Sequence, residues 1–198
     1  ILSAEGKISM GRLKKGDLDT EGWTNLATLQ GRIDSAPLFI DDSPNMTLME
    51  IRAKCRRLKQ RNDLKLVVLD YLQLMSSGKK VESRQQEVSE FSRSLKLLAK
   101  ELDVPVIALS QLNRGSEQRT DKRPMVSDLR ESGSIEQDAD MVILLHREDM
   151  YNPDSERVGE ADMIIAKHRG GPTRTIPLAF SGKYSRFNNM ANEAPPQY

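Results

Sequence analysis

Apolar runs without internal alternation constrain the fold of this chain more than any other feature. The segments KLVVLDYLQLM (residues 65–75) and VPVIALSQ (residues 104–111) are largely apolar at consecutive positions, which predicts strands buried on both faces. Between them, apolar residues recur in steps of three and four over residues 88–102, which predicts a long helix. Strands of this kind joined by helices predict an α/β fold with a mostly parallel sheet flanked by helices.

The N-terminal part of the chain shows two further helical patterns and one short strand. Residues 20–34 have apolar side chains at helical spacing, and PLFIDD (residues 37–42) predicts a strand that ends in two carboxylates. Residues 46–61 predict an amphipathic helix whose exterior is strongly basic. That basic face is an early candidate for contacts with nucleic acid or with a partner.

The C-terminal part predicts strands followed by hairpins. ADMVILLHR (residues 139–147) and ADMIIAKHR (residues 161–169) are apolar runs, and the turn-like GGPT and SGK follow them. We therefore expect two consecutive C-terminal β-hairpins. Residues 191–198 have no periodic pattern, so we expect one domain over residues 1–190 and a disordered tail.

Composition narrows the functional classes. With 30 Lys and Arg against 29 Asp and Glu, the net charge is +1, so any case for nucleic acid rests on local patches. The single cysteine, Cys55, excludes an internal disulfide and a zinc cluster, which points to a reducing, cytoplasmic location. No apolar segment approaches the roughly 18 residues of a membrane span. The chain starts at Ile1 without Met, so we expect it to begin inside a longer protein.

Polar side chains follow three of the predicted strands. They are Asp70 after the first; Ser110 and Gln111 after the second; and Lys167, His168 and Arg169 after a later one. In open α/β sheets, ligands bind beyond the carboxyl ends of the strands. A carboxylate there can hold Mg²⁺, an amide can hydrogen-bond a phosphate oxygen, and a guanidinium can neutralise a transferring phosphoryl group. The pattern predicts a nucleotide triphosphatase.

Each of these residues also has a simpler interpretation. Asp70 can be a turn residue or a helix cap, and Gln111 can merely end a strand. The basic residues before the Gly-Gly-Pro turn can be solvated hairpin positions, and the basic helix can be a solvated face. Taken singly, the residues do not decide between these interpretations.

The sequences of four segments, and their order along the chain, decide between these interpretations. They are KLVVLDYLQLM, SRSLKLLAKELDVPVIALSQLNR, SDLRESGSIEQDAD and IIAKHRGGP. Together they resemble the C-terminal ATPase domain of the bacterial replicative DNA helicase, the DnaB family, over residues 1–190. The resemblance implies a RecA-like P-loop NTPase core that uses ATP and Mg²⁺. It also implies a homohexamer that moves 5′ to 3′ along single-stranded DNA at the replication fork, with primase and a helicase loader as partners.

The resemblance also implies roles for individual residues at the nucleotide. Asp70 matches the Walker B aspartate that holds Mg²⁺, and Gln111 matches the glutamine that senses the γ-phosphate. Lys167 and Arg169 match a basic pair, including an arginine finger, that reaches the nucleotide of a neighbouring subunit. His168 stands between them, where the family often has Gln.

A separate segment, DLRESGS, matches the loop that contacts single-stranded DNA in the channel of the ring. The resemblance places Arg130, Glu131 and Gly133 in that loop, and Arg and backbone N–H groups can hold phosphates without reading bases. The alternative is a helix start, because Ser134 and Gln137 form the capping-box pattern S-x-x-Q.

A P-loop motif, G-x-x-x-x-G-K-[ST], is missing from the 198 residues. Gly6 and Gly11 have the right spacing, but Arg12 and Leu13 follow them and no strand precedes them. The resemblance places both the P-loop and the water-activating glutamate upstream of residue 1. We therefore expect an N-terminally truncated motor domain that is inactive alone. A designed truncation, a partial sequence and an intein that splits the gene all remain open as explanations.

Two other functions stay in view. The isolated chain can be a non-enzymatic module that binds DNA or a partner through the helix at residues 47–62. A recombinase-like or clock-protein relative on the same core is disfavoured by DLRESGSIEQDAD, at residues 128–140.

Overall fold

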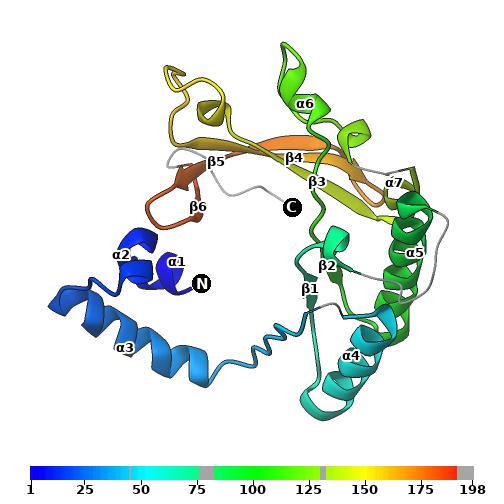
Figure 1. Ribbon diagram of the computed structural model, residues 1–198, viewed down its shortest axis with the longest axis horizontal. Coiled ribbons are helices and arrows are strands. Elements are labelled where there is room, and N and C mark those ends of the chain that lie inside the picture. The colour runs from blue at the N-terminus through cyan, green and yellow to red at the C-terminus, as the bar shows by residue number, and fades with distance from the viewer. Residues whose placement is uncertain (45, 76–82, 130–132, 191–198) are drawn as a thin grey trace. The chain divides into compact units, whose positions relative to one another are not determined.

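The computed structural model describes residues 1–44, 46–75, 83–129 and 133–190 (Figure 1). Two compact units divide the chain. One comprises Ile1–Ile40, Leu145–Ile164 and Arg174–Tyr198, and the other comprises Asp41–Leu144 and Ile165–Thr173. The tail over residues 191–198, expected to be disordered, lies outside the described residues. In the part of the chain that is described, no helix is long and apolar enough to cross a membrane.

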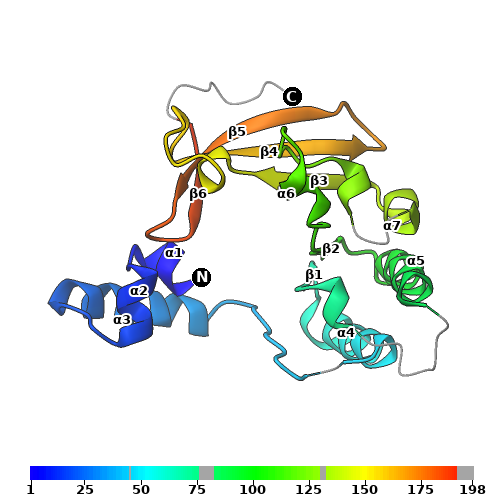
Figure 2. The same ribbon diagram turned by 45° about the horizontal axis from the view of Figure 1, so that its top comes forward.

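The second unit is built on a parallel strand pair and two long helices. Strands β1 (Val67–Leu69) and β2 (Val106–Ala108) pair in parallel, with Val67 opposite Val106 and Leu69 opposite Ala108. Helices α4 (Leu48–Asn62) and α5 (Arg84–Leu102) lie side by side (Figures 1 and 2). The largest fully buried side chains all belong to α5: Phe91, Leu98 and Val88. The predicted strand–helix–strand order is confirmed, and α5 supplies the centre of this core.

The strands of this unit bury one face rather than two. Val67 is 8% exposed, whereas Val68 and Ile107 are 57% and 50% exposed. In β3 (Met141–His146), buried and exposed residues alternate in the same way. The expectation of burial on both faces is therefore wrong for the chain as described, because a strand apolar on both sides needs a cover on each.

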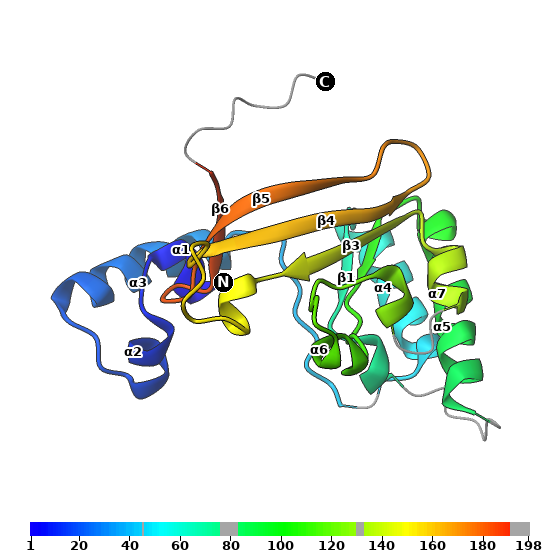
Figure 3. The ribbon, with the colours of Figure 1, turned by 90° about the horizontal axis from the view of Figure 1, so that it is seen from above.

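The remaining strands form a second sheet. Its order is β3-β4-β5-β6, with β4 at Glu160–His168, β5 at Arg174–Ser181 and β6 at Arg186–Asn189, and the long strands run beside one another in Figure 3. The last two strands pair antiparallel, with Phe180 opposite Phe187, and these two rings pack 4.9 Å apart between centroids. The predicted C-terminal hairpin strands are confirmed.

The first unit begins with three helices. They are α1 (Leu2–Gly6), α2 (Met10–Lys15) and α3 (Thr20–Asp34). The Asp19 carboxylate accepts a hydrogen bond of 2.9 Å from the Gly22 N–H, so it caps α3 as expected for an N-terminal Asp. The Arg186 guanidinium donates to the Ala4 carbonyl at 2.9 Å, which ties α1 to β6.

The strand predicted at residues 37–42 does not form. The chain there has no regular structure, and Leu38, Phe39 and Ile40 are 47%, 49% and 78% exposed. A strand is stabilised by hydrogen bonds to a neighbour, and no described strand pairs with this segment. Its apolar composition alone was therefore not enough to make it a strand.

Candidate active site

Asp70 and Gln111 follow neighbouring parallel strands and lie at the same edge of the β1–β2 pair. The backbone stays hydrogen-bonded beyond the strands, because the Leu109 N–H donates to the Leu69 carbonyl and the Leu72 N–H donates to the Leu109 carbonyl, both at 2.9 Å. The side chain of Asp70 is exposed and makes no hydrogen bond or ion pair with the described residues. Its carboxylate is therefore available to a ligand at this edge.

The side chain of Gln73 bridges the two strand ends. It lies in the short 3-10 turn η1 (Leu72–Leu74). Its Nε2 donates to Ser110 Oγ at 3.0 Å and to the Gln111 carbonyl at 3.4 Å, and its Oε1 accepts from the Gln111 N–H at 3.2 Å. The loop after β1 and the loop after β2 are thus joined through one amide group.

Arg84, at the start of α5, holds η1 from the other side. Its guanidinium donates to the carbonyls of Gln73 at 2.9 Å and Met75 at 3.1 Å. The same guanidinium pairs with the Glu87 carboxylate, which is buried. The Asp70 loop is consequently fixed to the main helix of the unit as well as to the neighbouring strand end.

The basic pair Lys167 and Arg169 lies against the end of helix α7 (Gly133–Asp138). Lys167 Nζ donates to the Glu136 carbonyl, and Arg169 Nη2 donates to the Gln137 carbonyl at 2.6 Å. Cations are favourable at this end of a helix, where the last carbonyls lack partners and carry partial negative charge. The two residues therefore cap a helix of their own chain in this structure, while the Arg169 side chain stays 54% exposed.

Asp140 holds Arg169 in place. Its backbone carbonyl accepts from the Arg169 N–H at 2.9 Å, and its carboxylate lies 3.5 Å from Arg169 Nη1. The carboxylate also pairs with Lys96 of α5, and this hydrogen bond lowers the pKa of Asp140. Asp140 thus stays ionised beside two cations.

The structure separates His168 from Lys167. Lys167 and His168 are the last two residues of β4, and successive side chains of a strand point to opposite faces, so His168 leaves the face of Lys167. Its ring lies over the turn, where a Cβ atom added at Gly171 would come within 2.6 Å of two ring atoms. The role of His168 in cofactor binding, which the resemblance implies, stays a prediction.

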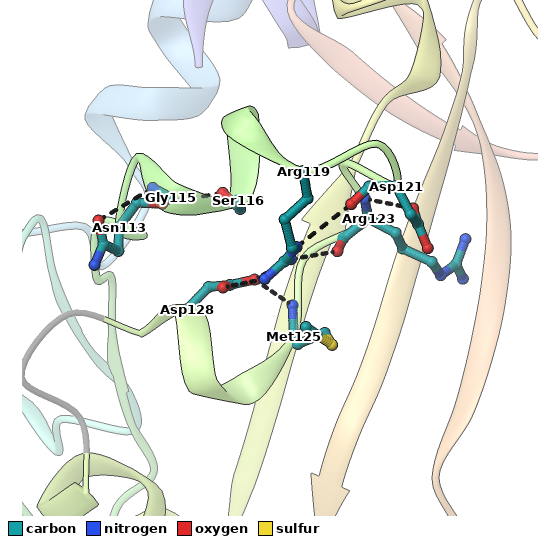
Figure 4. A network of polar contacts seen from close by, with 8 residues as sticks. All are labelled: Asn113, Gly115, Ser116, Arg119, Asp121, Arg123, Met125 and Asp128. Carbon is teal, nitrogen blue, oxygen red and sulfur yellow. Dashed lines mark hydrogen bonds and ion pairs between the residues drawn. The ribbon is translucent and has the colours of Figure 1, made fainter.

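The loop of residues 113–128 is closed by one buried carboxylate (Figure 4). Arg119 donates from Nη1 and Nη2 to the two carboxylate oxygens of Asp128, both at 2.7 Å, and the Met125 N–H donates to Oδ2 at 2.8 Å. The Asp128 carbonyl accepts from the Asn113 N–H at 2.7 Å. The loop therefore returns to its starting point, Asn113, two residues after Gln111.

The chain then enters the predicted DNA loop. Leu129 forms an isolated antiparallel bridge with Leu112, so the residue after Gln111 pairs with the residue before Arg130. Arg130 and Glu131 lie outside the described residues. Gly133 is described and is the first residue of α7.

The predicted helix start at this loop is confirmed, with one difference. Ser134 lies inside α7 rather than at its N-cap. Its hydroxyl hydrogen-bonds that of Ser89 on α5 at 2.7 Å, so it joins two helices. The capping-box interpretation of Ser134 is therefore wrong, because its hydroxyl is used across the helix interface.

Comparison with known proteins decides the family. Residues 1–189 match the family described as DnaB-like helicase C terminal domain. The chain belongs to this family. The replicative DNA helicases DnaB of Leifsonia xyli subsp. xyli and of Geobacillus stearothermophilus are 70% and 56% identical to it over 191 residues, which is 96% of the chain. The chain spans 42% of the length of each of these curated relatives.

Solved structures agree with the DnaB-like assignment. One that is described as an ATPase domain has a TM-score of 0.90 and 44% identity, and the match covers 96% of this chain and 68% of that one. A DnaB-like replicative helicase, described with its interactions with primase, has the same TM-score and identity and covers 96% and 47%. The predicted RecA-like α/β fold is confirmed.

Two contacts at this site were not predicted from the sequence. In the sequence, Gln73 stands out only as the one amide in an otherwise apolar run after Asp70. The Arg119–Asp128 pair had no signal, because a contact between residues nine positions apart in a loop follows no helical or strand period.

The Asp128 carboxylate generates a prediction about pH and stability. The hydrogen bond from Arg119 lowers the pKa of Asp128 below its usual value near 4, so its stabilising effect is fully present above about pH 4. We expect Asp128→Asn to reduce the free energy of unfolding of the chain at pH 7 by about 2 kcal/mol, as for loss of hydrogen bonds to a charged group. Urea denaturation at several pH values measures this.

The difference between Asp128→Asn and wild type should shrink as the pH falls from about 4 through the lowered pKa, because the wild-type carboxyl is then protonated too. Asp138→Asn is a matched control, since its carboxylate makes no hydrogen bond or ion pair with the described residues. A deficit for Asp128→Asn that stays constant down to about pH 2 would contradict the role of the ionised carboxylate.

Proposed function

We propose that this chain is the larger part of the motor domain of a hexameric replicative DNA helicase. The full-length protein would couple ATP hydrolysis to 5′ to 3′ movement on single-stranded DNA and would unwind the duplex at the replication fork. The main support is the family match over residues 1–189, together with an edge where Asp70 and Gln111 follow adjacent parallel strands. Ligand sites of open α/β sheets lie at such edges.

The described residues fit one part of a Mg-ATP site. Proteins hold Mg²⁺ with one or two carboxylates, waters and the substrate phosphates, so the Asp70 carboxylate, which has no partner among the described residues, suits that role. The described chain has no group of three His, Cys, Asp or Glu that could hold a metal by itself. When bound, the ion supplies charge neutralisation at the phosphates. Gln111 would contact the γ-phosphate, and the phosphate cradle would come from the rest of the full-length protein.

Arg169 would act as an arginine finger in the neighbouring subunit's site. Its side chain is 54% exposed although one of its guanidinium nitrogens donates to the end of α7. Lys167 shares this helix end and would complete the cationic surface. A cation supplied in trans stabilises charge on the transferring phosphoryl group and makes hydrolysis depend on ring assembly.

The DNA contact would come from Arg130, Glu131 and Gly133. The support is their place in the chain, since the preceding Leu129 pairs with Leu112 next to Gln111. A nucleotide-dependent shift at Gln111 would thus reach the DNA loop through two backbone segments. Primase is the partner best supported, because a similar helicase is described with its primase interactions, and a helicase loader is a family-level expectation.

The ion pairs of α4 weaken the case for the alternative function as a binding module. Arg56 and Arg52 both pair with Glu101 of α5 and lower its pKa to about 2, so this carboxylate stays ionised beside them. Lys54 pairs with Asp41. Several cations of the basic face are therefore balanced within the protein, and Arg57 and Arg61 are the exposed arginines of α4 that form no ion pair with the described residues.

The trans role of Arg169 is testable by mixing subunits of the full-length protein. We expect Arg169→Ala to slow hydrolysis on the order of 10³-fold while ATP binding changes little. Asp70→Ala should be inactive as well. A mixture of the two variants should regain part of the ATPase activity, because some interfaces then combine an intact Asp70 with an intact Arg169 from the next subunit.

Two measurements make this result decisive. Native mass spectrometry confirms that the two variants assemble together, and titration of Arg169→Ala into wild type reports coupling around the ring. Absence of recovery in mixed rings, with activity falling in proportion to the mutant fraction, would show that Arg169 does not act in trans.

The DNA assignment predicts a difference between two arginines. In the full-length protein, Arg130→Ala should weaken single-strand binding about equally for all base sequences and reduce the salt dependence of the affinity, because a phosphate contact is lost. Arg57→Ala on α4 is the matched control and should leave both unchanged. Fluorescence anisotropy at several salt concentrations tests this, and the reverse outcome would favour the module function.

A further inference from the structure

We propose that Gln73 is a positioning residue that holds Gln111 in register with Asp70. This inference rests on the proposed function, in which Asp70 and Gln111 serve one nucleotide. Gln73 itself is not placed at the nucleotide. It acts through its side-chain contacts with the strand end that carries Gln111.

The contacts of Gln73 reproduce the pairing of a β-ladder. A primary amide offers N–H donors and a carbonyl acceptor, the same two functions as a backbone residue. Its Oε1 accepts from the Gln111 N–H at 3.2 Å and its Nε2 donates to the Gln111 carbonyl at 3.4 Å. This is the double exchange that a hydrogen-bonded pair of antiparallel strands makes. The Gln73 side chain therefore adds ladder-like hydrogen bonds beyond the ends of the parallel strands β1 and β2.

A third contact fixes the plane of this amide. Nε2 also donates to Ser110 Oγ at 3.0 Å. Ser110 and Gln111 are consecutive, so Gln73 holds two successive residues after β2. An amide held by three hydrogen bonds cannot rotate without breaking at least one of them, which restricts the backbone from which the Gln111 side chain projects.

The backbone of Gln73 is anchored independently. Its carbonyl accepts from Arg84 Nη2 at 2.9 Å, and Arg84 is paired with the buried Glu87 on α5. Gln73 is thus attached at its backbone to the main helix and at its side chain to the neighbouring strand end. The segment from Asp70 to Gln73 becomes a short rigid link between the two candidate nucleotide contacts.

The chemistry of the bridge is specific for glutamine. Glutamate has the same length, but its ionised carboxylate cannot donate to Ser110 or to the Gln111 carbonyl. It would instead place an acceptor beside the Gln111 carbonyl, which is itself an acceptor. Alanine removes all three contacts. The two variants therefore separate the effect of length from the effect of the donor.

The test uses the full-length protein and four variants: Gln73→Ala, Gln73→Glu, Gln111→Ala and the double variant Gln73→Ala/Gln111→Ala. Gln86→Ala is the control, since the side chain of this exposed amide on α5 makes no hydrogen bond with the described residues. Steady-state kinetics gives kcat and KM for ATP. Competition with a fluorescent nucleotide gives the binding preference for a non-hydrolysable ATP analogue over ADP, and thermal denaturation shows whether each variant is folded.

We expect Gln73→Ala and Gln73→Glu to lower kcat about tenfold, as for loss of one or two hydrogen bonds, with KM within about twofold of wild type. The preference for the ATP analogue should fall, because the γ-phosphate contact is misplaced. The double variant should be no slower than Gln111→Ala alone, since both changes remove the same interaction.

The outcomes separate this inference from the proposed function. If Gln111→Ala leaves hydrolysis and nucleotide preference unchanged, the γ-phosphate role of Gln111 is wrong. If Gln111→Ala is impaired while both folded Gln73 variants behave like Gln86→Ala, only the positioning role of Gln73 is wrong. Losses that multiply in the double variant would likewise overturn it, because they would show that Gln73 acts independently of Gln111.

Discussion

Parallel pairing of β1 with β2 is the interaction on which the candidate site depends. Because the strands run in the same direction, Asp70 and Gln111 leave them at the same edge. Each of these strands has only three residues, so side-chain contacts are also needed to hold the edge together. Gln73 pairs with the backbone after β2, and Arg84 fastens the loop after β1 to α5.

Helix α7 connects the other candidate contacts. Its first residue, Gly133, belongs to the predicted DNA loop, and its last carbonyls accept from Lys167 and Arg169. Along its side it packs on α5, with the Ser134 and Ser89 hydroxyls in contact. We infer that α5 links the predicted DNA loop, the basic pair and the Asp70 loop, because each of them, or a residue that holds it, contacts this helix. Such an arrangement would suit the proposed motor, in which nucleotide and DNA must influence each other.

Periodicity in the sequence was sufficient to predict the long helices and the strand order, because burial of apolar residues at regular spacing leaves a clear pattern. It failed for residues 37–42, since a strand also requires a partner, and for Ser134, whose hydroxyl bonds across a helix interface. The pattern of apolar runs placed Asp70 and Gln111 at strand ends, and the parallel pair brings both to one edge. The same pattern could not show the loop closed by Arg119 and Asp128, which depends on contacts without a sequence period.

In the proposed function, the ends of β1 and β2 respond together to nucleotide. Hydrogen exchange of the full-length protein, read by mass spectrometry over residues 67–75 and 106–113, tests it most directly. A non-hydrolysable ATP analogue with Mg²⁺ should slow exchange in both segments more than ADP does, because Asp70 and Gln111 would then be bridged by one ligand. Unchanged exchange in both segments under saturating analogue, or slowing confined to α4, would contradict the account.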